Sequence, residues 1–326
     1  THTRFDRYSL EQGLSQSSAL CILQDSRGFL WIGTEDGLNR FDGYGFKIYR
    51  HDPEEPHSLS NSHISSLYKD PSGVLWVGTY GGGLNRLDPQ TGWFTHYRHN
   101  AQDANSLSED QVKAVTGGRD GVLWIGTRGG GLNRFDPAQE RWKRYQTDPD
   151  DPYSLSDDRV TSILEDSSGV LWVGTAIGLN RLDRETDRWQ RYQWDPDNPH
   201  SLYGYTVQSI HEDRSGNLWI GTVGGGLNRF DRGTETFVHY RHVPADLHSL
   251  SSDSVTAVLE DPFGELWVGT EGGLDRFDRE KEQFIHYRSV PGDPHSLSDN
   301  QVSSLGLDLS GGLWVGTRGG GLNRYD

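Results

Sequence analysis

Seven copies of the segment Leu-Trp-(Val/Ile)-Gly-Thr recur along the 326 residues, and this repeat constrains the fold more than any other feature. Between 45 and 48 residues separate successive copies, whose tryptophans are Trp31, Trp76, Trp124, Trp172, Trp219, Trp267 and Trp314. Each copy sits in a longer unit with an apolar run, Asp-x-x-Gly, a Gly-rich turn, Gly-Leu-Asn-Arg-Phe-Asp and an aromatic-x-x-Tyr segment. Four short strands fit each unit, so the period predicts a β-propeller whose blades surround a channel.

The repeat predicts an all-β, seven-bladed β-propeller that forms one domain over residues 1–326. The last unit ends at Arg324, Tyr325 and Asp326 without its aromatic-x-x-Tyr strand, and Phe5 to Tyr8 provide an extra copy of that strand. We therefore expect the N-terminal strand, at about 4–9, to complete blade seven and remove an open sheet edge. The expected blades cover about 18–50, 63–98, 111–146, 159–193, 206–241, 254–288 and 301–326.

Charge and hydropathy exclude several classes of partner. The 31 basic and 47 acidic residues give a net charge of −16, which opposes binding to a nucleic-acid backbone. No apolar stretch approaches the roughly 20 residues of a membrane-spanning helix, and no N-terminal signal segment is present. We expect this piece to contact neither nucleic acid nor membrane. With Cys21 as the only cysteine, an intrachain disulfide and a thiolate metal cluster are excluded.

The residues from Gly13 to Gly43, with Gly13-Leu14-Ser15 and Leu30-Trp31-Ile32-Gly33-Thr34 among them, resemble the first blade of the two-component regulator propeller family. Later units, with Gly-Leu-Asn-Arg-Phe-Asp and Asp-Pro-x-x-Pro-x-Ser-Leu-Ser, resemble the same repeat, so the likeness covers essentially the whole chain. The resemblance implies an extracytoplasmic, periplasmic sensor propeller of a bacterial hybrid histidine kinase or related regulator. It also implies that further domains of a parent sensor protein are its partners.

Residues that recur in every blade are interpreted as scaffold. The seven tryptophans should pack between blades, because identical residues occupy identical structural places in a repeat protein. Asp-x-x-Gly offers one dependable carboxylate where a calcium site needs six to eight oxygens, so we interpret it as a turn. The histidines lie on different blades, and no nucleophile elbow or phosphate loop is present. We therefore predict no catalytic residues, no metal and no cofactor.

Blade-specific residues are the candidates for a ligand site. The position after Gly-Thr and the position before each inner strand face the same channel mouth, and their side chains differ from blade to blade. Arginine pairs with carboxylate or sulfate, and aromatic rings stack on sugars, so these residues suit a polar ligand. The predicted ligand-binding residues are Glu35, Tyr80, Arg128, Glu271, Arg318, His63, Arg159, Tyr205 and Trp194.

Three functions compete at this point. The leading hypothesis is a non-enzymatic sensor propeller that binds a glycan or other small polar ligand at the channel mouth. The near uniformity of the blades favours an alternative, an engineered or naturally amplified repeat scaffold for protein interaction. The Leu-Trp repeats also resemble, distantly, the seven-bladed streptogramin lyases, which is the third hypothesis. The sequence shows no singular His and Glu pair that such an enzyme needs.

Overall fold

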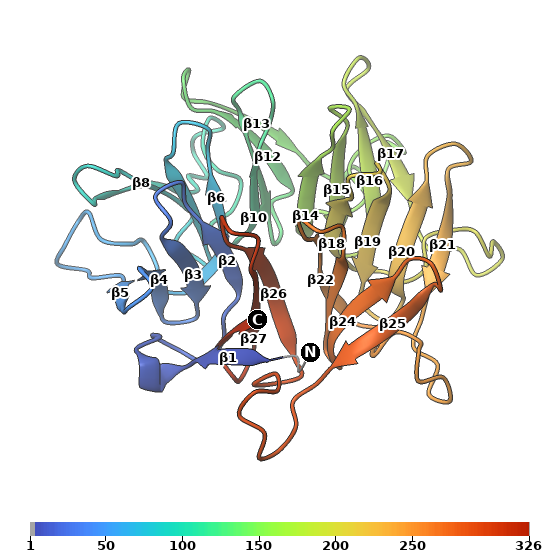
Figure 1. Ribbon diagram of the computed structural model, residues 1–326. Helices are drawn as coiled ribbons and strands as arrows, with labels where there is room; N and C mark the ends of the chain where they lie inside the picture. Colours follow the sequence, from blue (N-terminus) through green and yellow to red (C-terminus); the bar gives the residue numbers. More distant parts are fainter. Residues whose placement is uncertain (1–3, 326) are drawn as a thin grey trace.

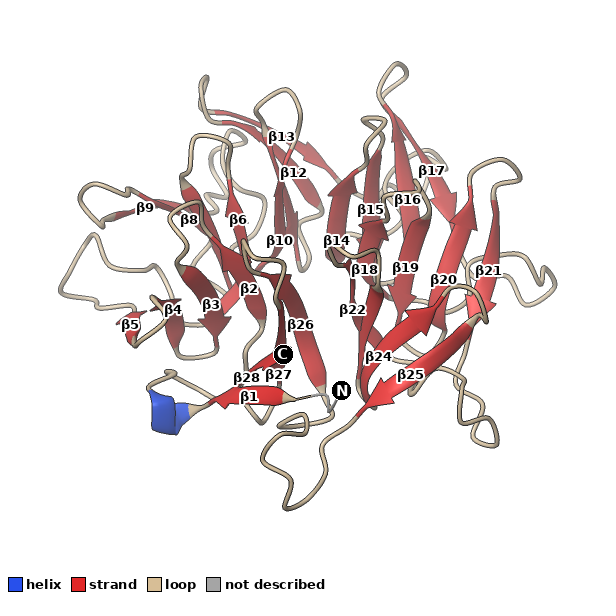
Figure 2. Ribbon diagram, in the orientation of Figure 1, coloured by secondary structure: helices blue, strands red, loops and turns tan. Residues whose placement is uncertain are grey.

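The computed structural model describes residues 4–325, in which 28 strands form seven four-stranded antiparallel sheets arranged in a ring (Figure 1). Within that range the one helix is the three-residue 3-10 turn η1 (Leu10–Gln12) (Figure 2). The all-β, seven-bladed propeller predicted from the repeat is confirmed. Residues 1–3 and 326, the two ends of the expected domain, lie outside the described residues.

Each blade is a meander that runs from the channel outward, so consecutive strands are neighbours in the sheet. The innermost strands are β2 (Cys21–Gln24), β6 (Ile64–Lys69), β10 (Val112–Gly117), β14 (Val160–Glu165), β18 (Val207–Glu212), β22 (Val255–Glu260) and β26 (Val302–Leu307). The second strands are β3 (Leu30–Thr34), β7 (Leu75–Thr79), β11 (Leu123–Thr127), β15 (Leu171–Thr175), β19 (Leu218–Thr222), β23 (Leu266–Thr270) and β27 (Leu313–Thr317).

The third strands are β4 (Gly37–Phe41), β8 (Leu84–Leu87), β12 (Leu132–Asp136), β16 (Gly178–Asp183), β20 (Gly226–Asp231), β24 (Gly273–Asp278) and β28 (Leu322–Tyr325). The outer strands of blades one to six are β5 (Phe46–Tyr49), β9 (Phe94–Tyr97), β13 (Arg141–Tyr145), β17 (Arg188–Tyr192), β21 (Thr236–Tyr240) and β25 (Gln283–Tyr287). Blade seven takes its outer strand from the start of the chain, β1 (Phe5–Tyr8).

The N-terminal strand closes the ring as predicted. Strand β1 pairs antiparallel with β28, with Phe5 opposite Tyr325 and Tyr8 opposite Leu322. In Figure 1 the blue N-terminal strand lies beside the red C-terminal strands. The Arg7 guanidinium donates to the carbonyl of Ser296 at 2.8 Å, which ties β1 to the loop before β26. Closure therefore joins the two ends of the chain through both backbone and side-chain hydrogen bonds.

The second strands hold the core between blades. All five residues of β11 are buried, and Trp124 packs against the Leu155, Val160 and Trp189 side chains of blade four. Gly126, two residues after Trp124, permits this close packing, because a Cβ at Gly126 would lie 2.4 Å from Cγ1 of Val160. The seven tryptophans of the repeat are 0 to 5 % exposed, so their predicted role as interblade core is confirmed.

The Asp of Asp-x-x-Gly does more than shape a turn. In six blades its Oδ2 accepts the indole N–H of the tryptophan six residues later, as Asp166 does from Trp172 at 2.8 Å. We call each such pair an Asp–Trp clamp. Blade three has Gly118 at this position, and the buried Nε1 of Trp124 finds no partner among the described residues. Six clamps thus satisfy a polar group that would otherwise be buried without a hydrogen bond.

The Asn of Gly-Leu-Asn-Arg fixes the loop that leads into each blade. Asn180 is buried, accepts the backbone N–H of Ser156 at 2.9 Å and donates to its hydroxyl at 2.9 Å. Blade six has Asp275 instead, which accepts the Ser251 N–H and pairs with Nδ1 of His286 at 2.6 Å. The hydrogen bond to Asp275 raises the pKa of His286. Both Asn and Asp at this position therefore accept the backbone N–H of the loop, as a structural role of the motif requires.

Candidate ligand site at the channel mouth

The backbone of the mouth repeats, whereas its side chains do not. We call the face that carries the turns between second and third strands the mouth face. In blades two to seven, the backbone amide of the residue after Gly-Thr donates to the carbonyl of the residue before the inner strand. Arg128 donates to Gln111 at 3.0 Å, and Arg318 donates to Gln301 at 2.9 Å. Ala176 and Val223 make the same bond, so the fold leaves the side chain at this position free to vary.

Three predicted residues form one contact group across blades two and three. The His63 ring stacks on Tyr80 with centroids 5.1 Å apart and an interplanar angle of 27°. The Arg128 guanidinium lies 5.3 Å from the centroid of the Tyr80 ring and donates from Nη1 to its hydroxyl at 2.7 Å. Burial lowers the pKa of His63, Glu35 raises it, and Lys113 and Arg128 lower it further. At neutral pH His63 is therefore an uncharged ring beside a cation.

A second group lies in the atypical loop before blade five. Trp194 and Tyr205 meet edge to face with centroids 5.2 Å apart, and Tyr205 is 57 % exposed. The loop differs from the repeat because Tyr203 replaces the usual serine, and its carbonyl takes over the hydrogen bond from Nδ2 of Asn228. The sequence-predicted aromatic pair therefore forms a surface that the repeat itself does not require.

The remaining predicted residues stand apart. Arg159 forms an ion pair with Asp157 at 2.9 Å, so its charge is already matched. Glu35 is exposed and accepts from Nε2 of Gln16 at 3.5 Å. Glu271 and Arg318 are exposed on blades six and seven and form no ion pair with each other. The structure thus brings His63, Tyr80 and Arg128 together, pairs Trp194 with Tyr205, and leaves four residues separate.

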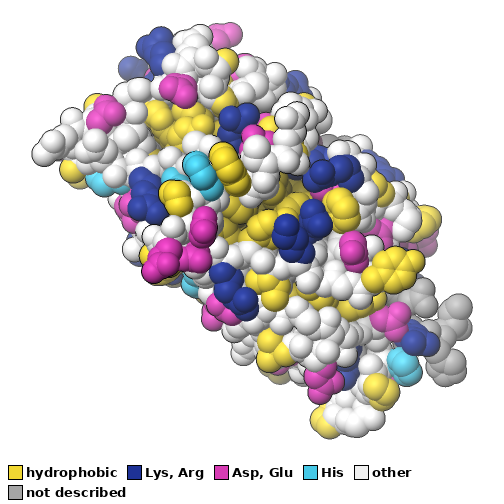
Figure 3. All heavy atoms as spheres, turned by 90° about the vertical axis from the view of Figure 1, so that its left-hand side faces the viewer, with side chains coloured by type: hydrophobic (Ala, Val, Ile, Leu, Met, Phe, Trp, Pro, Cys, Tyr) yellow, Lys and Arg dark blue, Asp and Glu magenta, His cyan; other side chains and the backbone are white. Residues whose placement is uncertain are grey.

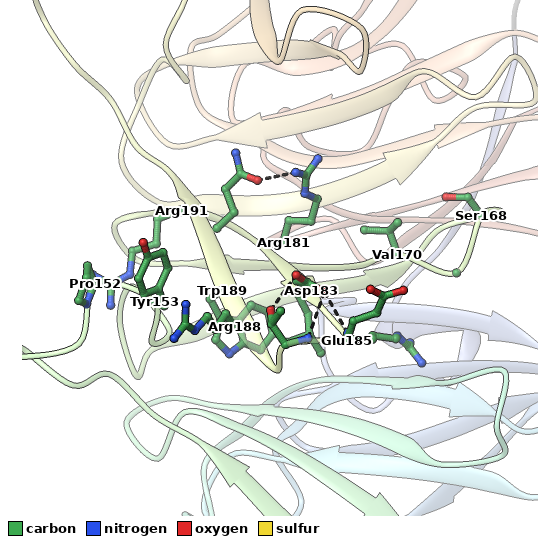
Figure 4. Close-up of a pocket in the computed structure, with 15 residues that line it drawn as sticks. Pro152, Tyr153, Ser168, Val170, Arg181, Asp183, Glu185, Arg188, Trp189 and Arg191 are labelled. Carbon is green, nitrogen blue, oxygen red and sulfur yellow. Dashed lines mark hydrogen bonds between the residues drawn. The ribbon is translucent and has the colours of Figure 1, made fainter.

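The outer edge of blade four carries a groove of about 830 Å³ that contains none of the predicted residues. Figure 4 shows Tyr153, Arg188 and Arg191 at one end of it and Val170 at the other. Its arginines are engaged, since Arg188 lies 4.7 Å from the Tyr153 ring centroid and Arg191 donates to the Ser154 carbonyl at 2.8 Å. The groove is therefore lined largely by groups that already bind one another.

The ring's exterior shows no single-sign charged face in the view of Figure 3, where basic and acidic side chains are interspersed. Within residues 4–325, no three His, Cys, Asp or Glu side chains are grouped as metal ligands. The described chain forms no helix that is long and apolar enough to cross a membrane.

Comparison with known proteins identifies the repeat. Five segments match the family model described as two component regulator propeller: residues 13–36, 58–81, 154–176, 204–224 and 249–272. The chain carries two-component regulator propeller repeats. The resemblance predicted from the Gly13 to Gly43 segment is thereby confirmed.

Two similar proteins are much longer than this chain. Histidine kinase P4 of Formosa agariphila is 55 % identical over 56 residues, which is 17 % of this chain and 4 % of that protein. A structure described as the extracellular domain of the hybrid two-component system BT3049 of B. thetaiotaomicron has a TM-score of 0.86 and 29 % identity. The match covers 100 % of this chain and 42 % of that chain. This chain therefore spans less than half the length of either relative.

The virginiamycin B lyase of Staphylococcus aureus is also similar, with a TM-score of 0.71 and 14 % identity over 99 % of both chains. At that identity the likeness shows the shared propeller fold.

Proposed function

We propose that this ring is the non-enzymatic sensor module of a bacterial two-component signalling protein and binds a small polar ligand, such as a carbohydrate, at the mouth face. One observation carries the proposal. The same backbone hydrogen bond recurs at the mouth in blades two to seven, yet the side chains there differ from blade to blade and most of them reach solvent. A ring that needed these residues for stability would repeat them, as it repeats Trp and Asn.

The chemistry of the exposed groups suits such a ligand. Tyr205 and Trp194 offer aromatic surface for a sugar face, and Arg128 offers a charge-assisted donor already oriented by Tyr80. The similarity to an extracellular two-component domain supports an extracytoplasmic location and partners among the other domains of a parent sensor protein. With a net charge of −16, the ring is unsuited to nucleic acid.

Two other functions remain as outcomes of the test. A scaffold for protein interaction, natural or engineered, is favoured by the nearly uniform blades and would bind no small ligand. A lyase, favoured by the shared fold of virginiamycin B lyase, would consume its ligand during a titration.

Calorimetric titration with a panel of neutral and acidic sugars and small metabolites tests the proposal. Tyr205→Ala should weaken binding of a sugar by about 0.5–1.5 kcal/mol, the typical worth of an aromatic contact beyond its area. Tyr44→Ala is the matched control, because Tyr44 is 99 % exposed and lies in the turn between β4 and β5 on the opposite face. An equal effect of both variants, or no binding by any compound, would contradict a ligand site at the mouth.

A further inference from the structure

The His286 ring in β25 lies between two oxygen atoms. Its Nδ1 is 2.6 Å from Oδ1 of Asp275 on β24, and its Nε2 is 2.9 Å from the backbone carbonyl oxygen of Leu247. Leu247 lies in the loop that joins β21 to β22, so the ring links this loop to the third strand of blade six. An ionised carboxylate and a carbonyl only accept hydrogen bonds, so both ring nitrogens must donate. The two contacts together therefore require an imidazolium.

Loss of one proton from His286 breaks one of the two contacts, because a neutral imidazole has one N–H and one lone pair. The Asp275 side chain is fully buried, whereas the contact with Leu247 is at the surface. Removing the donor from a buried carboxylate costs more than releasing an exposed carbonyl, so the remaining proton stays on Nδ1. Nε2 then presents a lone pair to the Leu247 oxygen, and the loop loses this hydrogen bond.

The equivalent side chains of other blades do not depend on such a proton. His96 and His239 each donate from Nε2 to one loop carbonyl, at 2.7 and 2.8 Å, and each lies opposite an asparagine in the register. A neutral ring makes that single bond. In blades three, four and seven the loop is held by an arginine, which stays charged: Arg144, Arg191 and Arg7. Within residues 4–325, blade six alone combines a histidine with Asp275 in place of Asn.

The groups around His286 favour the imidazolium on balance. Asp275 raises the pKa of His286, mainly through its hydrogen bond and also through its charge, and the loop carbonyl raises it further. Partial burial and the charge of Arg288 oppose this rise. The titratable and charged groups that line the pocket of about 190 Å³ beside the ring are Arg288, His242 and Asp246. His286 therefore loses its proton at a higher pH than an ordinary histidine.

We propose that His286, Asp275 and the Leu247 carbonyl form a pH-sensitive latch that holds the loop over residues 243–250 to blade six while His286 is protonated. The inference goes beyond the proposed function, because the latch acts without a ligand. A raised pKa in the folded ring means that the latch contributes its full stabilisation below the ordinary histidine value of about 6.5 and loses it as pH rises through the pKa of His286. Asp275 also accepts the Ser251 N–H at 2.8 Å, so the same carboxylate holds the segment that leads to the mouth.

NMR titration of the histidine ring protons and backbone hydrogen exchange, both on the whole ring, test the latch. The pKa of His286 should lie at least about one unit above that of His239, as expected for a histidine paired with a carboxylate. Exchange protection at the Asp246 and Ser249 amides, corrected for the intrinsic effect of pH, should fall by about tenfold as pH rises through that pKa, since one charge-assisted hydrogen bond is lost.

Asp275→Asn restores the residue of the other blades and is the decisive variant. It should return the pKa of His286 to the ordinary range and make the protection of the loop independent of pH. The matched control is His96→Gln, which removes a histidine anchor that has no carboxylate partner and should leave the pH dependence of the loop over residues 243–250 unchanged.

An ordinary pKa for His286 in the unaltered ring overturns the latch, and so does loop protection that does not change through that pKa. Retention of the pH dependence in Asp275→Asn also contradicts it. Should Asp275→Asn fail to fold, His286→Arg provides the same test, because it introduces the anchor of blades three, four and seven and keeps its charge. Protection that still falls with rising pH in His286→Arg would refute the latch.

Discussion

The two faces of the ring differ in how their charged side chains are paired. On the face that carries the Asp–Trp clamps, Asp166 accepts from the Trp172 indole and also binds Arg232 of the next blade at 2.7 Å. On the mouth face, Arg318 extends into solvent without an acid partner among the described residues. Repeated residues use their polar groups to hold the ring, whereas some of the blade-specific ones, unlike the paired Arg159, leave their charge exposed to solvent.

The clamp face is itself uneven. Asp166 and Asp213 each bind an arginine of the following blade, Arg232 and Arg279, and blade three has no clamp at all. Burial alone would raise the pKa of Asp166, but hydrogen bonds from Ser168, Trp172 and Arg232 outweigh it and lower the pKa to about 2. The pKa of Asp213 is likewise lowered to about 2. Blades four to six are therefore joined by an extra set of ion pairs.

Trp124→Ala should produce the largest effect. Truncating this interblade tryptophan should lower the free energy of unfolding by about 3–5 kcal/mol, as for other large core side chains. Ligand affinity should not change selectively, because Trp124 lies in the core and not at the mouth. Urea unfolding measures the loss, and a loss below about 1 kcal/mol would mean that Trp124 is not core.

Asp166→Ala tests the clamp itself. The variant leaves the buried Trp172 N–H and the Arg232 guanidinium unpaired, so we expect a loss of about 3 kcal/mol in urea unfolding. Asp120→Ala is the control, because Asp120 binds Arg134 at 2.7 Å in an exposed pair that should contribute at most about 1 kcal/mol. Equal losses in the two variants would show that the clamp adds nothing beyond a surface ion pair.

Acid should weaken the clamp face before the mouth face. The pKa values of Asp166 and Asp213 are lowered to about 2, below the ordinary aspartate value of about 3.9, so their stabilisation is present above about pH 4 and is lost as pH falls toward 2. Each contributes about 2 kcal/mol by this shift. Unfolding of an Asp166→Asn, Asp213→Asn double variant should therefore depend less on pH in that window. An unchanged pH slope would contradict the assigned ion pairs.

Blade three can be given the clamp that it lacks. Gly118→Asp combined with Asp120→Ser recreates the Asp-Arg-Ser-Gly turn of blade five, and the new carboxylate can accept the Trp124 indole N–H. We expect a gain of about 1 kcal/mol relative to Asp120→Ser alone, measured by urea unfolding. A net loss would show that the turn of blade three has a different backbone requirement.

The smallest effect on stability is expected at the mouth. Arg318→Ala should change the free energy of unfolding by less than about 0.5 kcal/mol, because Ala176 occupies the equivalent position in blade four. Thermal unfolding measures this directly. A loss as large as that of Asp166→Ala would place Arg318 in the scaffold and remove the contrast between the two faces.

The fold could be predicted from the sequence because its determinants repeat. The spacing of the tryptophans gives seven blades, and the extra aromatic strand at Phe5 to Tyr8 gives the closure. The clamp was missed, although its signal is visible: an Asp precedes six of the seven tryptophans by six residues. The Asp of Asp-x-x-Gly is a common turn residue, and this property alone accounted for its recurrence. A hydrogen bond to the indole was therefore not predicted.

The candidate site was less predictable than the fold, because the direction of each side chain decides which residues contact one another. The sequence placed Arg159 and Arg128 on the same mouth, but Asp157 neutralises one and Tyr80 orients the other. Those outcomes depend on rotamers and on packing against the next blade.

The central claim is that the mouth binds the ligand while the repeated residues only hold the ring. A crystal structure of the ring with selenate, located by its anomalous signal, tests this most directly. The account predicts selenate within hydrogen-bond distance of Arg128 or Arg318. Selenate in the groove of blade four or on the clamp face, with the mouth empty, would contradict it.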